Sequence, residues 1–251
     1  MSKQARQARS ARLAAQQRRQ RRNRLLAAGG GVVILGLLVA IVAGLVHAAG
    51  TGDSPEVTQR PTVAPANANA SGAIVIGDAA APVRLEIYLD YMCPYCGRFE
   101  RANSGELERL VADGTVRLEL YPLAFLDRAS AGTRYSTRAA NAVAVVADRA
   151  PAKVLAFNSA LFTRQPREGS EGLTDNEIAA VAVGAGVAQD VAGLFTAGTF
   201  EPWIVTRTDA AFGTGGITGT PTVKIDGAMF KGDLYTAGPL TQAVMDAKSR
   251  P

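Results

Sequence analysis

The chain has few residues that could hold a metal ion: its 251 residues include two cysteines, Cys93 and Cys96, and a single histidine, His47. A tetrahedral zinc site usually takes four cysteine or histidine side chains, so we predict no metal site. An inert structural disulfide is also disfavoured, because a loop over two intervening residues constrains little of the unfolded chain. The favoured use of Cys93-Pro94-Tyr95-Cys96 is thiol-disulfide exchange, with the two cysteines as the catalytic pair.

Acidic residues are missing from residues 1–24, which hold nine lysines and arginines, and charge of either sign is missing from residues 25–46. The apolar run is long enough to cross a bilayer, and basic residues before such a run place the N-terminus in the cytoplasm. We therefore predict a basic cytoplasmic tail over 1–24 and a transmembrane anchor over 25–47, with the rest of this single-pass protein extracytoplasmic. The alternative is a signal peptide cleaved near residue 48, which the length of the apolar run disfavours.

The net charge of +5 belongs to the tail, because the rest of the chain has 18 basic against 22 acidic residues. No basic surface for nucleic acid is therefore expected there. Residues 48–72 are rich in alanine, proline, glycine, threonine and asparagine, which predicts a flexible linker. Residues 73–251 are long enough to form one domain with a hydrophobic core.

The cysteine pair lies between a predicted strand and a predicted helix. Residues 83–89 alternate apolar with polar side chains, which is typical of a strand, and the amphipathic pattern that follows predicts a helix ending near Gly114. Free N–H groups and the helix dipole at the start of this helix favour an anion, so we expect the Cys93 thiolate to be stabilised and the pKa of this thiol to be lowered. Cys93 is then the nucleophile. Cys96, one turn further in, is expected to be more buried and to resolve the mixed disulfide.

The remaining pattern predicts an α/β domain. Residues 73–76 are a short apolar start, and residues 115–121 alternate again, which predicts a second strand parallel to 83–89. Helical spacings, a capping box, a proline in a first turn and an Asp-Gly hairpin turn predict the later elements. These are helices over 138–148, 152–164, from Thr174 to about Gly184, from about Pro202 to Phe212 and over 239–248, and strands over 222–225 and 228–231.

Residues 74–248 resemble the DsbA-like thiol-disulfide oxidoreductases, which are thioredoxin folds with a helical insertion. The resemblance rests on three motifs in the same order. They are Asp90-Tyr91-x-Cys93-Pro94-Tyr95-Cys96, Tyr121-Pro122-Leu123 and Gly216-Ile217-Thr218-Gly219-Thr220-Pro221-Thr222. The resemblance implies a helical insertion over about 123–200, a cis peptide bond before Pro221, and a Thr220 backbone free to pair with an extended substrate. It also implies that Pro94 and Tyr95 support the site.

One position departs from the family pattern. Relatives often carry a buried carboxylate six residues before the first cysteine, where it helps to move protons, but this chain has Ile87 there. Glu86 precedes it and, with the period of a strand, is expected to face the other side. We give Glu86 only a minor supporting role.

The resemblance implies an enzyme of the bacterial cell envelope that needs no cofactor. Its oxidised Cys93–Cys96 pair would donate disulfides to secreted proteins, and a membrane partner of the DsbB or VKOR type would reoxidise it. Two alternatives stay open: an envelope reductase, for example in cytochrome maturation, and a redox-silent module that holds peptides at Thr220. Pro94-Tyr95 supplies no cation to the thiolate, so we expect a weaker oxidant than the strongest members.

Overall fold

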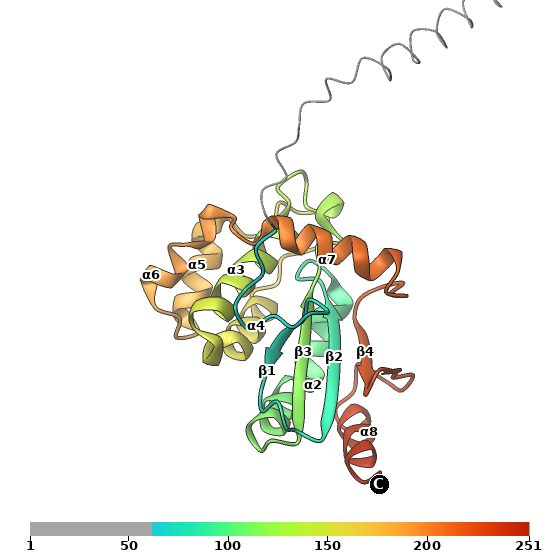
Figure 1. Ribbon diagram of the computed structural model, residues 1–251. Coiled ribbons are helices and arrows are strands. Elements are labelled where there is room, and N and C mark those ends of the chain that lie inside the picture. The colour runs from blue at the N-terminus through green and yellow to red at the C-terminus, as the bar shows by residue number, and fades with distance from the viewer. Residues whose placement is uncertain (1–61, 251) are drawn as a thin grey trace, which may run out of the picture. The chain divides into compact units, whose positions relative to one another are not determined.

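The structure, a computed structural model, describes residues 62–250. Its centre is a five-stranded sheet with the strand order β1-β3-β2-β4-β5 (Figure 1). The strands are β1 (Ile74–Ile76), β2 (Val83–Leu89), β3 (Val116–Pro122), β4 (Thr222–Ile225) and β5 (Ala228–Met229). Strands β2 and β3 are parallel, as predicted, and the other neighbours are antiparallel.

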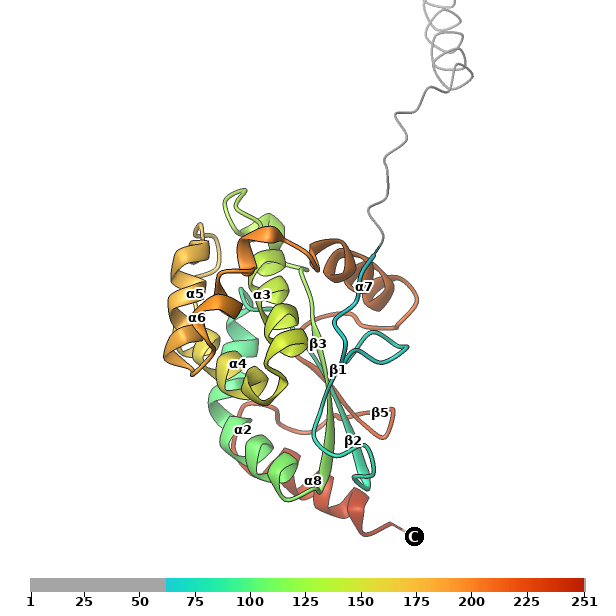
Figure 2. The ribbon, with the colours of Figure 1, turned by 60° about the vertical axis from the view of Figure 1, so that its left-hand side comes forward.

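Helices cover both faces of the sheet and form a lobe beside it (Figures 1 and 2). The helices are α2 (Pro94–Ala112), α3 (Tyr135–Arg149), α4 (Val154–Thr163), α5 (Asp175–Gly184), α6 (Gln189–Ala192), α7 (Glu201–Gly213) and α8 (Pro239–Lys248). Helices α2 and α8 pack on one face together with the lobe formed by α3 to α6. Helix α7 joins this core through Trp203 and Ile204, and its later residue Ala211 packs on the other face. The architecture is therefore an α/β fold with a helical insertion, as the sequence predicts.

The alternation along β2 divides its side chains between two apolar clusters. Leu85, Ile87 and Leu89 belong to the large core under α2, and Tyr88 belongs to a smaller cluster that includes Ala211 of α7. Both faces of the strand are buried, because α7 covers the side that an exposed sheet would leave in solvent. Glu86 and Tyr88 of the alternating pattern are thus buried, while Arg84 stays partly exposed.

Residues 62–72 pack against the domain, so the flexible linker expected over 48–72 does not extend to residue 72. The Ala66 N–H donates to the Asp148 carboxylate at 2.9 Å, and Ala68 forms an isolated bridge with Ile74. The Val75 N–H donates to the Asn67 carbonyl at 3.1 Å. The amino-acid composition of this segment does not predict these contacts, because they are made mainly by backbone groups.

Most predicted elements are found within a few residues of their expected bounds. The capping box at Thr174 is present, with the Glu177 N–H donating to the Thr174 hydroxyl and the Glu177 carboxylate accepting from the Thr174 N–H. Pro202 lies in the first turn of α7, and α8 spans the expected residues. The strand expected over 228–231 is shorter, since β5 ends at Met229.

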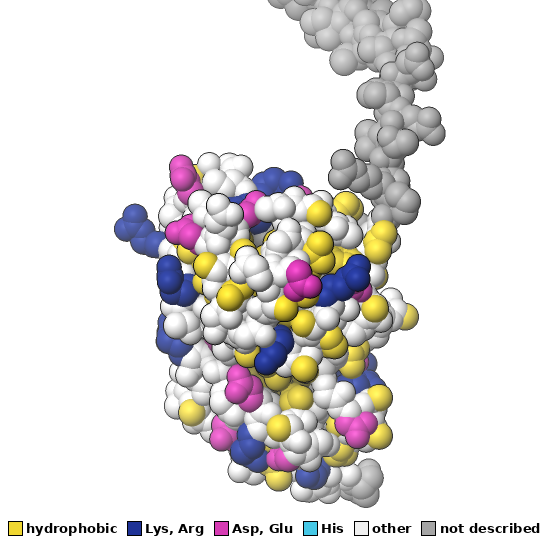
Figure 3. Space-filling view, turned by 90° about the vertical axis from the view of Figure 1, so that its left-hand side faces the viewer, with side chains coloured by type: hydrophobic (Ala, Val, Ile, Leu, Met, Phe, Trp, Pro, Cys, Tyr) yellow, Lys and Arg dark blue, Asp and Glu magenta, His cyan; other side chains and the backbone are white. Residues whose placement is uncertain are grey.

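The tail over 1–24 and the anchor over 25–47 lie outside the described residues. Within residues 62–250, no helix is both long enough and apolar enough to cross a membrane. On the face shown in Figure 3, which includes the lobe, lysines and arginines are interspersed with acidic residues. This face carries no extended basic patch of the kind that binds nucleic acid.

Candidate active site

The cysteine pair lies where the sequence places it, at the junction between β2 and α2. Strand β2 ends at Leu89 and α2 begins at Pro94, and Cys93 is the residue that caps the N-terminus of the helix, with φ −72° and ψ 116°. The Cys93 N–H donates to the Asp90 carbonyl at 3.0 Å, which closes the turn between them. Pro94 has no N–H, so the N–H groups of the first turn of α2 that can stabilise an anion on Cys93 are those of Tyr95 and Cys96.

The two sulfur atoms differ in exposure in the order that the sequence predicts. Cys93 is 5% exposed and Cys96 is completely buried. The Cys93 thiol donates to the Thr220 carbonyl oxygen at 3.3 Å, and the Asp90 N–H donates to the Cys96 sulfur at 3.5 Å. The Thr220–Pro221 peptide bond is cis, as the resemblance implies. The cysteines and the Thr220–Pro221 segment, 127 residues apart in sequence, thus form one site.

The two thiols have opposite pKa shifts. The pKa of Cys93 is lowered from 9.0 to about 6, chiefly by a hydrogen bond from the Cys96 thiol, with further contributions from the Thr220 side chain and from the N–H groups of Cys96 and Tyr95. Burial opposes this lowering but does not cancel it. The pKa of Cys96 is raised, first by its own burial and then by the hydrogen bond that its thiol donates to Cys93 and by the negative charge of Cys93. At neutral pH the site therefore favours one thiolate, on Cys93.

Asp90 is a buried carboxylate that sequence reasoning left out of the site. It is completely buried, and its oxygens accept from the Met92 N–H at 2.8 Å, the Leu126 N–H at 2.8 Å and the Ser136 hydroxyl at 2.6 Å. Burial raises the pKa of Asp90 to about 6, against the effect of these hydrogen bonds. Its position three residues before Cys93 was visible in the sequence, but two of its three donors, Leu126 and Ser136, come from the helical insertion.

Glu86 lies away from the cysteines. Its carboxylate is 3.4 Å from the Arg84 guanidinium and accepts from the Tyr88 hydroxyl at 3.1 Å. Tyr88 belongs to the cluster under α7, whereas both cysteines belong to the core on the opposite face of the sheet. The alternation of the strand therefore separates Glu86 from the sulfur atoms, and the structure does not bring it into the site.

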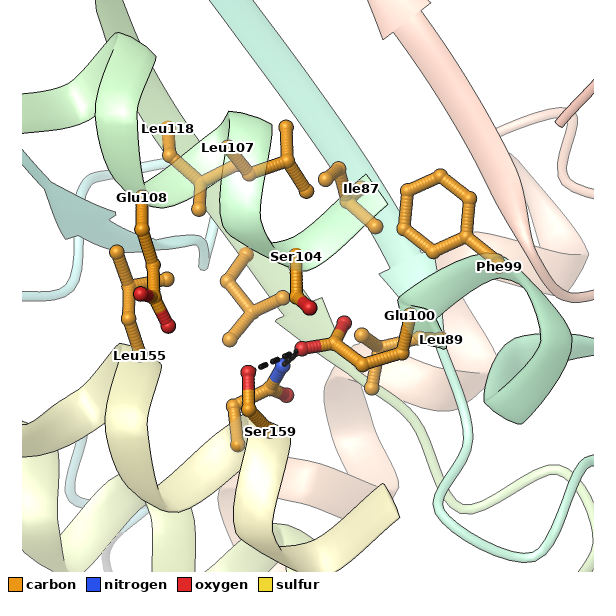
Figure 4. A pocket seen from close by; sticks show the side chains of 12 residues that line it. Ile87, Leu89, Phe99, Glu100, Ser104, Leu107, Glu108, Leu118, Leu155 and Ser159 are labelled. Carbon is orange, nitrogen blue, oxygen red and sulfur yellow. Dashed lines mark hydrogen bonds between the residues drawn. The ribbon is translucent and has the colours of Figure 1, made fainter. Parts of the chain in front are cut away.

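Near Ile87, a different acidic residue is buried beneath α2. Glu100 lines a cavity of about 10 Å³ together with Ile87 and Leu89 (Figure 4). Its carboxylate accepts from the Ser159 hydroxyl at 2.6 Å and from the Asn158 amide at 3.0 Å, and burial raises its pKa. The cavity next to Ile87 thus does contain a carboxyl group. It is supplied by Glu100 of α2 and not by β2.

An aromatic surface borders the cysteines. Tyr95 is 54% exposed, and its ring lies 6.0 Å from that of Tyr235. The Arg98 guanidinium lies 4.6 Å from the centre of the Tyr235 ring, close enough for a cation–π contact. Pro94 is exposed as well, so both residues between the cysteines face solvent. Within residues 62–250, no cluster of three or more histidine, cysteine or acidic side chains could hold a metal ion.

Comparison with known proteins agrees with this geometry. The profile of the thioredoxin family matches residues 69–243. The fold is similar to that of the reduced disulfide oxidoreductase DsbG from Mycobacterium tuberculosis, with TM-score 0.63, 26% identity, and coverage of 73% of this chain and 90% of that one. It is similar to the thiol-disulfide oxidoreductase MdbA from Actinomyces oris, with TM-score 0.63, 28% identity, and coverage of 72% and 91%.

A curated relative matches a shorter stretch. The serine/threonine-protein kinase PknE from Mycobacterium tuberculosis is 36% identical over 113 residues, which is 43% of this chain. The aligned stretch spans only 20% of the kinase. This chain is thus similar to one part of that protein.

Proposed function

Because this chain belongs to the thioredoxin family and is a DsbA-like protein thiol-disulfide oxidoreductase, we propose that it acts outside the cytoplasm as an oxidase. Its oxidised Cys93–Cys96 pair donates a disulfide to secreted proteins. The single observation that carries the oxidase direction is the stabilised sulfur of Cys93 at the start of α2. A stabilised thiolate favours the reduced form of the pair, and a pair that favours its reduced form is a stronger oxidant.

The proposed exchange begins when a substrate thiolate attacks the Cys93 sulfur of the disulfide. A substrate–Cys93 bond forms, the Cys93–Cys96 bond breaks, and Cys96 takes up a proton because its pKa is raised. A second substrate thiolate then attacks the substrate sulfur, and Cys93 leaves as a thiolate. The two substrate thiols lose two electrons and two protons: the electrons reduce the cysteine pair, one proton ends on Cys96 and the other passes to solvent. The lowered pKa of Cys93 makes it a good leaving group in the second step.

The substrate we propose is an extended peptide segment with a reduced cysteine. The carbonyl of Thr220 already lies at the Cys93 sulfur, and Thr220 and Pro221 are partly exposed. An extended chain that pairs with the Thr220 backbone would present its own cysteine to Cys93. The family resemblance supports a membrane partner of the DsbB or VKOR type that accepts the electrons from the reduced pair.

The direction of exchange is tested by the reduction potential. Residues 60–251, which form one compact unit, are equilibrated with glutathione buffers, and the oxidised fraction is measured by alkylation of free thiols. We expect a potential between about −270 mV, the value for thioredoxin, and about −120 mV, the value for DsbA. A potential at or below that of thioredoxin would overturn the oxidase assignment and favour an envelope reductase.

The extracytoplasmic location rests on the basic tail and apolar run of residues 1–47. Protease added to intact protoplasts is expected to degrade the domain that contains the cysteines. Full protection of this domain would contradict the orientation. Release of a domain that starts near Ala49 into the medium would contradict a retained anchor.

A further inference from the structure

One side chain of the helical insertion reaches into the active-site turn. Gln165 follows the end of α4, and its Nε2 donates to the Tyr91 carbonyl at 3.1 Å and to the Cys93 carbonyl at 2.8 Å. Both N–H bonds of the amide group are therefore used by the turn. The two carbonyls lie on either side of Met92 and Cys93, so a single amide group spans the segment that carries the reactive sulfur.

The orientation of this amide follows from the chemistry of its partners. Carbonyl oxygens only accept hydrogen bonds, so the nitrogen of Gln165 must face them and its Oε1 must point elsewhere. The oxygen lies against Gly97 in the first turn of α2, where an added Cβ would collide with it. Gly97 is buried and has an ordinary helical backbone, so its lack of a side chain serves this close approach rather than an unusual φ.

We propose that Gln165 is a positioning residue for Cys93, and that Gly97 provides the space that it needs. By fixing both carbonyls, Gln165 holds the turn so that the Cys93 sulfur stays close to the Cys96 thiol and to the N–H groups of Tyr95 and Cys96, which stabilise its thiolate. When the amide is removed, Cys93 keeps its own chemical groups but the turn is free to shift. The thiolate then loses part of its stabilisation, and the pKa of Cys93 rises.

The other contacts between the insertion and this turn differ from those of Gln165 in the groups that they hold. Asp90 is held by Leu126 and Ser136, and the Tyr91 hydroxyl donates to Asn158 at 2.9 Å, but these contacts anchor side chains. Gln165 alone among the described side chains donates hydrogen bonds to the carbonyls of this turn. The proposal depends on the thiol chemistry of Cys93 and not on the direction of exchange.

The test measures the pH profile of iodoacetamide alkylation of Cys93 in the reduced, full-length protein. In Gln165→Met, we expect the rate at pH 5 to fall about threefold to tenfold, the equivalent of about one net hydrogen bond. Near pH 9 the native and variant rates should converge, because Cys93 is then a thiolate in both. The assay needs no protein substrate or redox partner, so failure of the proposed oxidase function would leave its result unchanged.

Two glycines of the same helix provide a matched comparison. Gly97→Ala should reproduce the effect of Gln165→Met, because the added Cβ displaces the amide, whereas Gly105→Ala has open space and should keep the native profile. In the Gln165→Ala background, Gly97→Ala should cause no further change. A native pH profile in a folded Gln165→Met or Gly97→Ala protein would overturn the proposal, as would fully additive effects in the double variant.

Discussion

The lowered pKa of Cys93 predicts that the stability of the reduced protein depends on pH in a way that the oxidised protein does not share. The pKa is about 6 in the folded protein against an ordinary value of 9.0. The thiolate therefore contributes stability that is fully present above pH 9 and is lost as the pH falls from about 9 to 6. The oxidised protein has no thiol at this position, so it lacks this contribution.

The size of the effect follows from the same two values. At about 1.4 kcal/mol per pH unit, the fall from 9.0 to about 6 corresponds to about 4 kcal/mol at high pH. Solvent at the mouth of the site screens part of this, so we expect about 2–4 kcal/mol. At pH 7, which lies only about one unit above the folded pKa, the thiolate stabilises the reduced protein by about 1.4 kcal/mol. This free energy corresponds to about 30 mV in the reduction potential of a two-electron couple.

Urea unfolding of residues 60–251 in both redox forms measures this contribution. The free energy of unfolding is determined at several pH values between 5 and 9, and the value for the oxidised form is subtracted from that for the reduced form. The subtraction removes groups that titrate equally in the two forms. The difference should rise across pH 6 to 9 in the native protein. It should stay flat when reduced Cys93→Ser, which cannot form the disulfide, takes the place of the reduced native protein in the subtraction. A flat difference in the native protein would refute the stabilised thiolate.

Three further predictions concern other residues of the domain. Asp90→Ala should lower the free energy of unfolding by about 2–4 kcal/mol because three donors lose their acceptor. Because the pKa of Asp90 is raised, the native protein should also lose stability as the pH rises from about 4 to 6. Urea unfolding should no longer detect this pH dependence in Asp90→Ala. Cys96→Ser should accumulate reductant-sensitive adducts with partner proteins on non-reducing gels, and Cys93→Ser far fewer; equal trapping would show that Cys93 is not the sulfur that bonds to partner proteins. Thr174→Ala should cost about 1 kcal/mol of stability through loss of the cap while leaving thiol exchange rates unchanged, and a slower exchange would contradict its purely local role.

Local patterns in the sequence were sufficient for β2, β3 and β4, for α8 and for the position of the cysteines. They were not sufficient for the start of α3, expected at Arg138 and found at Tyr135. Ser136 and Thr137 look like loop residues, but their hydroxyls bind the carboxylates of Asp90 and Asp127, which compensates for burying them. Polar residues at the end of a helix are thus ambiguous until their partners are known.

The same limit explains which site residues were missed. Gln165 is 72 residues from Cys93 in the sequence, and no spacing rule connects them. Asp90 lies within the motif, but its burial depends on donors from positions 126 and 136. A short motif is enough to identify the sulfur chemistry, because the two cysteines are close together in the sequence. The groups that hold the turn come from distant parts of the chain, so no short motif contains them.

The packing of residues 62–72 has a consequence for aggregation. Strand β1 is the edge of the sheet, and an uncovered edge offers free N–H and carbonyl groups to another molecule. The backbone of Asn67 and Asn69 occupies part of that edge, through hydrogen bonds of 3.1 Å with Val75 and 2.9 Å with Ala73. A recombinant fragment or a proteolytic product that began at Ala73 would leave these groups open to strands of neighbouring molecules. Cleavage before residue 62 would keep this part of the edge covered.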